Sequence, residues 1–265
     1  MRSNHDVLST LPRDDRLAGR TAWVTGSTSG IGEAIAHVLA ASGATVLVSG
    51  RDAARADSVT AAITAAGGAA RTLVADLAAP PAQLRATAAR AVELAGGRLD
   101  VLVNNAGVYP VSATEDLADD DLEAMLAVNV RAPHVLVGAL APAMADRGDG
   151  VVVDIGSWMA RVGSPFGAMY TATKAALEQL TRSWAAEYGP RGVRVNTVAP
   201  GVTATPGNAE AAAVLDQMTA STVAGRPVRP VDVALAVRWL VSDEAAFVHG
   251  TTVDVDGGIS ATRLG

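Results

Sequence analysis

Short apolar runs alternate with longer amphipathic stretches from residue 21 to the end of the chain. Most of the short runs lack polar alternation, which is typical of strands that are covered on both faces of a sheet. The pattern predicts strands at Thr21–Thr25, Thr45–Ser49, Arg71–Ala75, Leu99–Val103, Val151–Ile155, Val193–Val198 and Thr252–Val255.

The longer stretches are rich in alanine and follow the helical period. They predict helices at Ile31–Ser42, Ala53–Ala66, Pro80–Ala95, Ala118–Arg147, Ala168–Gly189 and Val231–Val241. Glycines follow several of these stretches, at positions where helices must end. Because strand, helix and strand repeat along the chain, we expect right-handed crossovers and an α/β fold: a doubly wound, seven-stranded parallel sheet flanked by helices on both faces.

The 265 residues show no internal repeat, linker or break in composition that would indicate a second domain. We expect an N-terminal extension over residues 1–17 and a single domain over residues 18–265, an ordinary size for one α/β domain. The extension lacks the apolar segment and cleavage site of a signal peptide. No stretch has the roughly 18 uninterrupted apolar residues of a membrane helix.

Composition narrows the function classes further. Cysteine is absent, which removes disulfides and thiol chemistry and favours a cytoplasmic location. The formal charge is -6 without any run of basic residues, so we expect neither nucleic acid nor a membrane surface as a partner. The histidines, His5, His37, His134 and His249, are scattered, and we expect no metal site.

A glycine-rich segment joins the first predicted strand to the first predicted helix. It places Gly26, Gly30 and Gly32 in the spacing G-x-x-x-G-x-G. Glycines permit a tight turn and bring backbone N–H groups close to a pyrophosphate at the positive end of the helix. No lysine follows Gly32, so the segment is not a P-loop. Taken alone, the motif leaves an ordinary glycine-rich turn as the alternative interpretation.

Polar residues follow the third and fourth predicted strands at the same edge of the sheet. Asp76 and Leu77 end the third strand, and Asn104-Asn105-Ala106-Gly107 ends the fourth. Ligands of doubly wound sheets bind beyond the carboxyl ends of the strands. Taken singly, the aspartate is explained by a helix cap and the asparagines by a turn. Together with the glycine turn they predict a dinucleotide site.

A second constellation lies in the carboxyl-terminal half. Tyr170 and Lys174 are four residues apart on one face of a predicted helix, where the ammonium is expected to lower the phenol pKa from roughly 10 toward neutrality. Such a tyrosine exchanges protons with a substrate near neutral pH. Ser157 follows the strand Val151–Ile155, and Asn129 is a polar residue within an apolar helical segment. The alternatives are a half-buried tyrosine beside a solvated lysine, a serine N-cap and a hydrogen-bonded kink residue.

Together these motifs resemble the short-chain dehydrogenase/reductase family in its single-domain form, which implies a Rossmann fold. The residues that carry the resemblance are Thr25-Gly26, Gly30-Ile31-Gly32, Asn104 to Gly107, Asn129, Ser157, Tyr170 to Lys174, Pro200-Gly201 and Asp256-Gly257-Gly258. Before Ser157, the family's usual Asn-x-Ser-Ser is replaced by Asp154-Ile155-Gly156-Ser157. This removes a hydroxyl and adds a carboxyl, so the local hydrogen bonds are expected to differ.

The resemblance implies roles for individual residues. Tyr170 would be the general acid/base, Ser157 would orient the reacting oxygen, and Lys174 would lower the Tyr170 pKa and hold the nicotinamide ribose. Asn129 would hold a water that connects Lys174 to solvent. The cofactor would contact Gly26, Ser29, Gly30, Ile31, Gly32, Arg51, Asp76, Leu77, Asn105, Ala106, Gly107, Tyr170, Lys174, Pro200, Gly201, Val202, Thr203 and Thr205.

The implied activity is the NAD(P)(H)-dependent interconversion of a secondary alcohol and a ketone by hydride transfer, in a homotetramer. One alternative is a 3-oxoacyl-thioester reductase that docks an acyl carrier protein on a basic patch, for which Arg161, Arg182, Arg191 and Arg194 are candidates. Another is a non-catalytic dinucleotide-binding regulatory protein, which would not need the complete catalytic set.

Cofactor choice depends on Ser49-Gly50-Arg51-Asp52 at the end of the second strand. An acidic residue there binds the ribose 2'-hydroxyl of NAD, whereas Arg51 would accommodate the 2'-phosphate of NADP. Asp52 has nearly the spacing of a ribose-binding acid, but it also has that of a helix N-cap. We therefore favour NADP(H), with NAD(H) as the alternative.

The resemblance places Val108, Tyr109, Pro110, Trp158, Met159, Phe166 and the loop Pro206–Gly225 around the substrate. Because several of these residues are aromatic in a chain with only 3% aromatic residues, we expect an apolar or cyclic carbonyl or alcohol substrate. The loop contains a helical pattern over Ala209–Met218. We expect it to act as a lid that orders over bound substrate.

Overall fold

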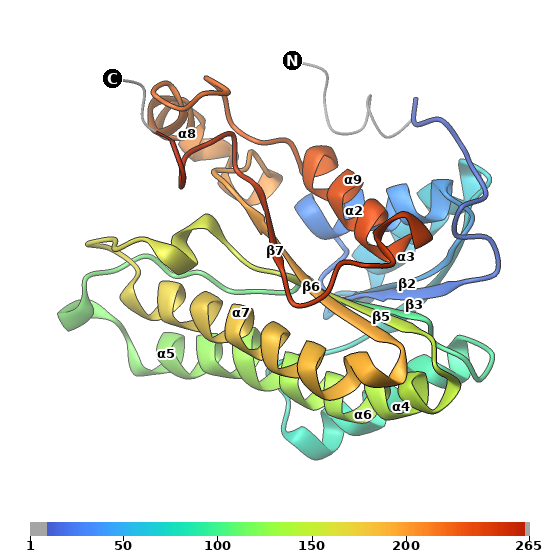
Figure 1. Ribbon diagram of the computed structural model, residues 1–265. Helices are drawn as coiled ribbons and strands as arrows, with labels where there is room; N and C mark the ends of the chain where they lie inside the picture. The colour runs from blue at the N-terminus through green and yellow to red at the C-terminus, as the bar shows by residue number, and fades with distance from the viewer. Residues whose placement is uncertain (1–9, 263–265) are drawn as a thin grey trace.

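The computed structural model describes residues 10–262 and shows one sheet with helices on both of its faces (Figure 1). Neighbouring strands pair in parallel, in the order β3-β2-β1-β4-β5-β6-β7. The strands are β1 (Thr21–Val24), β2 (Thr45–Gly50), β3 (Ala69–Val74), β4 (Val101–Asn104), β5 (Gly150–Ile155), β6 (Val193–Pro200) and β7 (Thr252–Val255). The predicted fold class, a doubly wound Rossmann fold, is thereby confirmed.

The helices form two layers, one on each face of the sheet (Figure 1). One layer contains α2 (Gly30–Ala41), α3 (Ala53–Ala65) and α9 (Pro230–Val241). The other contains α4 (Pro81–Leu94), α5 (Asp119–Leu126), α6 (Ala132–Arg147) and α7 (Ala168–Tyr188). A short helix, α8 (Ala212–Thr219), stands apart from both layers near the carboxyl end of β6.

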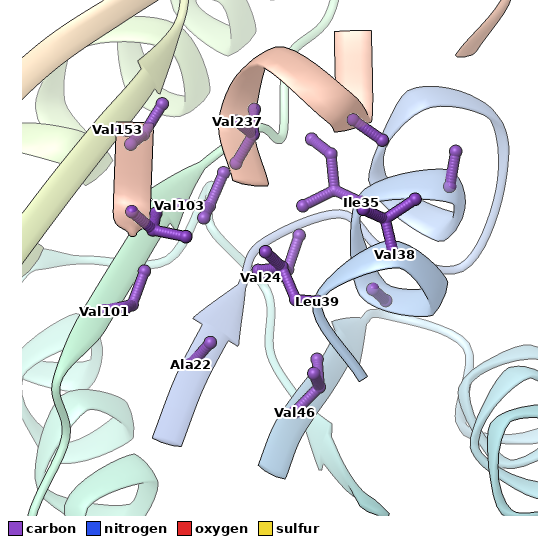
Figure 2. Close-up of a cluster of buried hydrophobic side chains, with 14 of the residues drawn as sticks. Ala22, Val24, Ile35, Val38, Leu39, Val46, Val101, Val103, Val153 and Val237 are labelled. Carbon is purple, nitrogen blue, oxygen red and sulfur yellow. The ribbon is translucent and has the colours of Figure 1, made fainter. Parts of the chain in front are cut away.

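Apolar strand residues fill the space between the sheet and each helical layer. Toward α2 and α9, the buried side chains of Val24 and Val153 lie in one cluster with Ile35 and Val237 (Figure 2). Because successive residues of a strand point to opposite faces, Val152 belongs to the second cluster, under α4, α6 and α7. Full burial of a side chain of this size stabilises the fold by about 1.5–3 kcal/mol.

Two elements differ from the sequence prediction. The expected helix Ala118–Arg147 is divided into α5 and α6 by a π-helical turn at Ala127–Arg131. The expected helical pattern Ala209–Met218 is a 3-10 helix over Pro206–Ala211 followed by α8. Both interruptions lie beside the cleft described below, where contacts with distant residues outweigh the local periodicity.

The segment Asp119–Arg147 is long and apolar enough, by composition alone, to cross a membrane, with a mean hydropathy of 1.4 over its most apolar window. In the structure 56% of that window is buried inside the protein. Leu136 and Leu140 belong to the cluster beneath the sheet. The apolar side chains of this segment are therefore used as core.

The described part of the expected N-terminal extension, residues 10–17, packs on the rest of the chain. Leu17 is buried in the core. Arg13 donates hydrogen bonds to the carbonyl oxygens of Ala66 (2.5 Å) and Gly67 (2.6 Å), just past the end of α3. Carbonyls at a helix end lack partners within the helix, so Arg13 satisfies groups that would otherwise need water. Residues 1–9 lie outside the described residues.

Candidate active site

A crevice opens where the strand order reverses, between β1 and β4, at the carboxyl ends of the strands. It contains a cavity of about 370 Å³. The predicted cofactor residues that line this cavity are Gly26, Ser29, Gly30, Ile31, Gly32, Arg51, Asp76, Leu77, Asn105, Ala106, Gly107 and Thr205. The fold thus brings together the segments that follow five different strands, β1, β2, β3, β4 and β6.

Gly26 and Gly32, in the glycine-rich segment after β1, occupy positions where a side chain would collide with neighbouring atoms. Gly26 has a φ of +62°, and a Cβ atom there would lie 2.8 Å from the Cα of Ala106. A Cβ atom on Gly32 would collide with the carbonyl oxygen of Gly26 and with the side chain of Asn105. Bare backbone and the first turn of α2 therefore border the cavity, an arrangement that fits the pyrophosphate of a dinucleotide.

Asn105 and Thr25 join the turn after β1 to the turn after β4. The Asn105 Nδ2 donates to the carbonyl oxygens of Thr25 (2.8 Å) and Gly26 (3.0 Å). The Thr25 Oγ1 accepts from the backbone N–H groups of Asn105 (3.0 Å) and Ala106 (3.1 Å). These hydrogen bonds hold two walls of the crevice at a fixed separation.

The end of β2 assigns different places to Arg51 and Asp52. The Asp52 carboxylate accepts from the backbone N–H of Arg55 at 3.1 Å and caps α3. Arg51 is exposed and lines the cavity. Thr28 also lines the cavity, although the sequence analysis gave it no role. This end of the crevice is therefore lined by a cation and a hydroxyl, while the Asp52 carboxylate serves as an N-cap.

A second cavity, of about 300 Å³, continues from the first. The two cavities share Ile31, Asn105, Gly107, Tyr109 and Thr205, so they form one continuous cleft. The second cavity is lined by the predicted residues Ser157, Tyr170, Lys174, Pro200, Gly201, Val202 and Thr203. Three of the four predicted catalytic side chains therefore meet at one end of the cleft and the glycine turn lies at the other.

Lys174 is the only lysine in the sequence, and it is 4% exposed. Its Nζ donates to the carbonyl oxygen of Ile155 at 2.8 Å and lies 5.9 Å from the centre of the Tyr170 ring. Burial lowers the pKa of Lys174 to about 8, and the nearby Asp154 carboxylate partly opposes that shift. The ammonium therefore stays charged at neutral pH. A lysine that occurs once in 265 residues is a signal that the sequence offers without any motif.

The pKa of Tyr170 is shifted in the direction opposite to the sequence expectation. Burial raises the pKa of Tyr170 above its usual value, and a hydrogen bond with Ser157 lowers it. Tyr109, whose ring meets that of Tyr170 edge-on at 6.3 Å, raises it further. The lowering expected from Lys174 does not prevail, because burial of the phenol is the largest effect. The phenol is therefore protonated at neutral pH.

Asn129 lies in the π-helical turn, is 1% exposed and is not among the residues that line the cleft. Its side chain accepts from the Val108 N–H at 2.9 Å and donates to the Val108 carbonyl at 2.9 Å. It also donates to the Thr173 Oγ1 at 3.1 Å. Asn129 thus ties the loop after β4 to α7 beside Lys174, as a hydrogen-bonded kink residue does. Ser157 similarly caps a 3-10 turn by accepting from the Met159 N–H.

Apolar side chains form much of the second cavity. The predicted residues Tyr109, Pro110, Trp158, Met159 and Phe166 line it, together with Val111, Leu215 and Met218. Val108 borders the first cavity instead. Tyr109, Val111, Phe166 and Met218 remain exposed despite their size. Exposed apolar groups gathered around a cavity are typical of a ligand site.

The four arginines considered for a carrier-protein patch do not form a common basic surface. Arg161 and Arg191 are ion-paired with aspartates, and Arg182 is hydrogen-bonded to a glutamine on the same helix. Arg194 is buried and donates to backbone carbonyls at the end of α9. Each guanidinium therefore has a local structural partner.

Comparison with known proteins gives matches over nearly the whole chain. A family model described as enoyl-(acyl carrier protein) reductase matches residues 26–260. The 2,5-dichloro-2,5-cyclohexadiene-1,4-diol dehydrogenase LinX of Sphingobium indicum is 36% identical over 247 residues, 93% of this chain and 98% of its own. Cyclopentanol dehydrogenase of Comamonas sp. is 34% identical over 253 residues, 93% of this chain and 99% of its own. D-threitol dehydrogenase of Mycolicibacterium smegmatis is 36% identical over 247 residues, 92% and 94% of the two chains.

Two solved structures with bound cofactor are also similar. A short-chain dehydrogenase of Burkholderia cenocepacia in complex with NADP is 40% identical, with a TM-score of 0.83 over 93% of this chain and 100% of that chain. A gluconate 5-dehydrogenase of the same organism, in complex with NADP and tartrate, is 34% identical, with a TM-score of 0.87 over 94% and 98% of the two chains. The chain belongs to the short-chain dehydrogenase/reductase family. It is an NAD(P)-dependent oxidoreductase of the kind that acts on alcohols, which sets aside the alternative of a regulatory protein without chemistry.

Proposed function

We propose that the protein is an NADP(H)-dependent dehydrogenase that interconverts a small apolar or cyclic secondary alcohol and its ketone, with Tyr170 as the general acid/base. One observation carries the proposal: Ser157, Tyr170 and Lys174 lie where a glycine-lined crevice joins an apolar pocket. A bound nicotinamide supplies or accepts the hydride, and the protein is left to provide orientation and a proton.

Tyr170 provides the proton. Its raised pKa keeps the phenol protonated at neutral pH, so that it donates to the oxygen of a ketone as the carbonyl carbon is reduced. Ser157, which hydrogen-bonds with Tyr170, orients the same oxygen. In the reverse direction the ionised form of Tyr170 accepts the proton of the alcohol, and the charged Lys174, whose Nζ lies 5.9 Å from the centre of the ring, stabilises that form.

Lys174 and Asn129 support this centre in different ways. We propose that Lys174 holds the nicotinamide ribose hydroxyls. Its charged side chain lines the second cavity, which continues from the first. A Cβ atom on Gly107 would lie 3.5 Å from the Lys174 Nζ and 3.4 Å from the Asn129 Oδ1, so these three residues converge. Asn129 acts as a positioning residue that holds the loop after β4 against α7.

NADP(H) is the preferred cofactor in this proposal. Arg51 is an exposed cation that lines the first cavity, and we propose that it binds the 2'-phosphate on the adenosine of the cofactor. Asp52, the acid that would favour NAD, is engaged as the cap of α3. Two of the similar structures hold NADP.

The pocket favours a ring alcohol over an open polyol. Tyr109, Trp158, Phe166 and Met218 offer it flat or flexible apolar surface, and such surfaces bind apolar rings by burying them. Two similar proteins are named for ring alcohols, cyclopentanol and a chlorinated cyclohexadiene diol, and a third is named for the open-chain polyol threitol. Of these, the ring alcohols fit the lining better.

We further propose that the protein forms a homotetramer and resides in the cytoplasm. The family resemblance, the alanine-rich helices α6 and α7 and the absence of cysteine support this. Light scattering at micromolar concentration tests the assembly, for which we expect about four times the chain mass of 26.7 kDa. A measured mass near that of one chain would reject the tetramer.

Initial rates with NADPH and with NADH test the activity itself. The panel contains cyclopentanone, cyclohexanone, an open-chain polyhydroxy ketone and an acetoacetyl thioester. We expect the highest kcat/KM for a ring ketone with NADPH. Rapid reduction of the thioester without turnover of the ring ketones would replace this proposal with the thioester-reductase alternative, and turnover of no member of the panel would reject both.

A further inference from the structure

A row of buried polar side chains crosses β4, β5 and β6, and Asn105 and Ile155, which follow two members of the row along the chain, line the cleft. Asn104 of β4, Asp154 of β5 and Thr197 of β6 are direct neighbours in the strand register. All three are between 0% and 3% exposed. Two residues earlier on the same strands, Leu102 and Val152 belong to the apolar core. The row therefore lies between that core and the segment that carries Ser157.

Asp154 is the acceptor in this row. Its Oδ1 accepts from the Asn104 Nδ2 at 2.8 Å, and its Oδ2 accepts from the Thr181 Oγ1 at 2.6 Å. The Thr181 Oγ1 also lies 2.8 Å from the Thr197 Oγ1. A hydroxyl has one proton, so when Thr181 donates to Asp154, Thr197 donates to Thr181. Both carboxyl oxygens thus meet donors, which favours the ionised form.

The departure from the family pattern at Gly156 fits the same row. A Cβ atom on Gly156 would lie 2.7 Å from the Thr197 Cγ2. The threonine methyl therefore occupies the space that a side chain at position 156 would need. Gly156 lets Thr197 stand beside Thr181 while the chain continues to Ser157.

The α7 helix carries both Thr181, which contacts this row, and the proposed catalytic residues Tyr170 and Lys174. Tyr170, Lys174, Glu178 and Thr181 follow one another at helical spacing on one face of α7. The Lys174 Nζ bonds to the carbonyl of Ile155, the residue that follows Asp154 in β5. The Lys174 ammonium and the Asp154 carboxyl are thus both buried between α7 and β5, and each acts electrostatically on the other.

The other charged groups around the row act chiefly on one another. Glu178, one turn beyond Lys174, is buried, and the Arg161 Nε lies 3.7 Å from its Oε1. Arg161, Arg182 and Asp254 are the charges that act on Glu178. Tyr170 is protonated because its pKa is raised. Asp154 is the charged group that acts on Lys174.

We propose that Asp154 is a positioning residue whose buried carboxylate is the counter-charge that keeps the Lys174 ammonium charged beside Tyr170. Its effect on turnover rests on the proposed function. The charge relationship between the two side chains does not, because it concerns the protein without any ligand.

Opposite charges buried together favour each other's ionised forms. Burial raises the pKa of Asp154 to about 6, against the opposing effects of Thr181, Asn104 and Lys174. Burial lowers the pKa of Lys174 to about 8. Both groups are therefore charged between these two values. Asparagine at position 154 keeps the shape and removes the charge, which leaves Lys174 as an uncompensated buried cation.

The single lysine makes the relationship directly measurable. Protein grown with lysine labelled with carbon-13 at Cε gives one side-chain NMR signal, that of Lys174. We expect its titration to give a pKa of about 8, with a smaller shift near pH 6 where Asp154 ionises. In Asp154→Asn the pKa of Lys174 falls by about one unit or more, and the smaller shift disappears. In Thr181→Val, which keeps the carboxylate and removes one donor, the smaller shift moves to higher pH.

Two further variants serve as controls. Asp100→Asn removes another buried carboxylate, which pairs with Arg98 at the opposite edge of the sheet, and should leave the Lys174 signal and turnover unchanged. Glu178→Gln tests the neighbouring carboxylate. The proposal is overturned if the Lys174 pKa falls in Glu178→Gln and not in Asp154→Asn. It is also overturned if the smaller change in the Lys174 signal near pH 6 keeps the same midpoint in Thr181→Val.

Turnover gives the second readout. In Asp154→Asn the fall of kcat/KM at high pH should begin at least about one pH unit lower than in the unchanged protein, with the Tyr170 ring still in place. If the unchanged protein reduces no ketone, the proposed function fails, and the NMR titration still decides the role of Asp154.

Discussion

The side chain of Thr28 occupies the space beside Gly50. A Cβ atom on Gly50 would lie 2.6 Å from the Thr28 Cγ2 and 3.1 Å from its Oγ1. The family resemblance implies that position 50 holds the acidic residue of members that select NAD, and a carboxylate could enter there only if Thr28 gave way. We therefore expect Thr28 and Gly50, from different turns, to influence cofactor choice together with Arg51.

Removal of the Arg51 guanidinium should weaken use of NADPH and leave use of NADH nearly unchanged. A charged hydrogen bond contributes about 1.5–3 kcal/mol, so kcat/KM with NADPH should fall about 10-fold to 100-fold in Arg51→Ala. Arg55→Ala, which removes an exposed arginine outside the cleft lining, is the matched control. A higher kcat/KM with NADH than with NADPH in the unchanged protein would contradict the assignment.

Reversal of the preference should require three changes. Gly50→Asp with Arg51→Ala adds the acid and removes the cation, but the Thr28 methyl would still collide with the new side chain. Adding Thr28→Ser removes that methyl. We expect the triple variant to prefer NADH, and the double variant to lose activity with both cofactors. Equal activity of the double and triple variants would show that Thr28 yields without cost.

Tyr170→Phe should remove the proton donor and keep the ring in place. General acid catalysis contributes roughly 100-fold to 10,000-fold, so kcat should fall at least that far while the NADPH dissociation constant, measured by fluorescence, changes little. Tyr109→Phe is a fitting comparison, because it removes the other phenol of the edge-on pair. Turnover at the unchanged rate in Tyr170→Phe would remove Tyr170 from the mechanism.

The rate of ketone reduction should fall as pH rises through about 8, the pKa to which burial lowers Lys174. Above that value the amine loses the charge that supports the site. Below it, Tyr170 keeps its proton because its own pKa is raised. A pH profile of kcat/KM between pH 6 and 10 checks this. A rate that stays constant to pH 10 would exclude Lys174 as the titrating group.

Ionisation of Asp154 should cost stability. Burial raises the pKa of Asp154 from 3.8 to about 6, so the folded state binds this proton more tightly than the unfolded state. The free energy of unfolding therefore decreases as pH rises from about 4 to about 6, by up to about 3 kcal/mol. Urea unfolding across this range should show the decrease in the unchanged protein and a smaller one in Asp154→Asn. Parallel curves for the two proteins would contradict it.

The loop Pro206–Gly225 should close over bound substrate. The residues on either side of it are joined by a parallel bridge between Thr203 and Val228, while Leu215 and Met218 of α8 line the pocket and Val214 is exposed. Limited proteolysis beside apolar residues should cut this segment in the free protein and spare it when NADPH and ketone are present. Equal cutting in both conditions would count against closure.

Motifs with local geometry were predictable from the sequence, and contacts between distant residues were not. The glycine turn and the pair of Tyr170 and Lys174 depend on short spacings, and the structure places both on the cleft. Helix periodicity predicted one continuous helix across Ala127–Arg131, because the bond between Asn129 and Val108 lies outside its range; only the alternative of a hydrogen-bonded kink residue at Asn129 pointed to the break. The opposite pKa shift of Tyr170 had the same origin, because burial depends on the assembled fold.

The hydrogen bonds of the polar row, Asn104, Asp154 and Thr197, also could not be predicted from the sequence. The sequence marked Asp154 as a departure from the family pattern, but not what the departure does. Its partners, Asn104 and Thr181, come from another strand and from α7, so the strand register brings one of them to the carboxylate and the packing of α7 on the sheet brings the other.

The single buried lysine has a consequence for the chemistry that the protein tolerates. Aldehydes and ketones condense with free amines to give imines, which is how lysines become covalently attached to carbonyl compounds. Every other side-chain cation of this chain apart from histidine is an arginine, whose guanidinium stays protonated and is a poor nucleophile. Oxidation of an alcohol yields a carbonyl compound, and the protein offers such compounds one side-chain amine, that of Lys174, a residue that is 4% exposed. The arginine side chains of the protein should therefore form few imines with aldehydes and ketones under conditions that modify lysine-rich proteins.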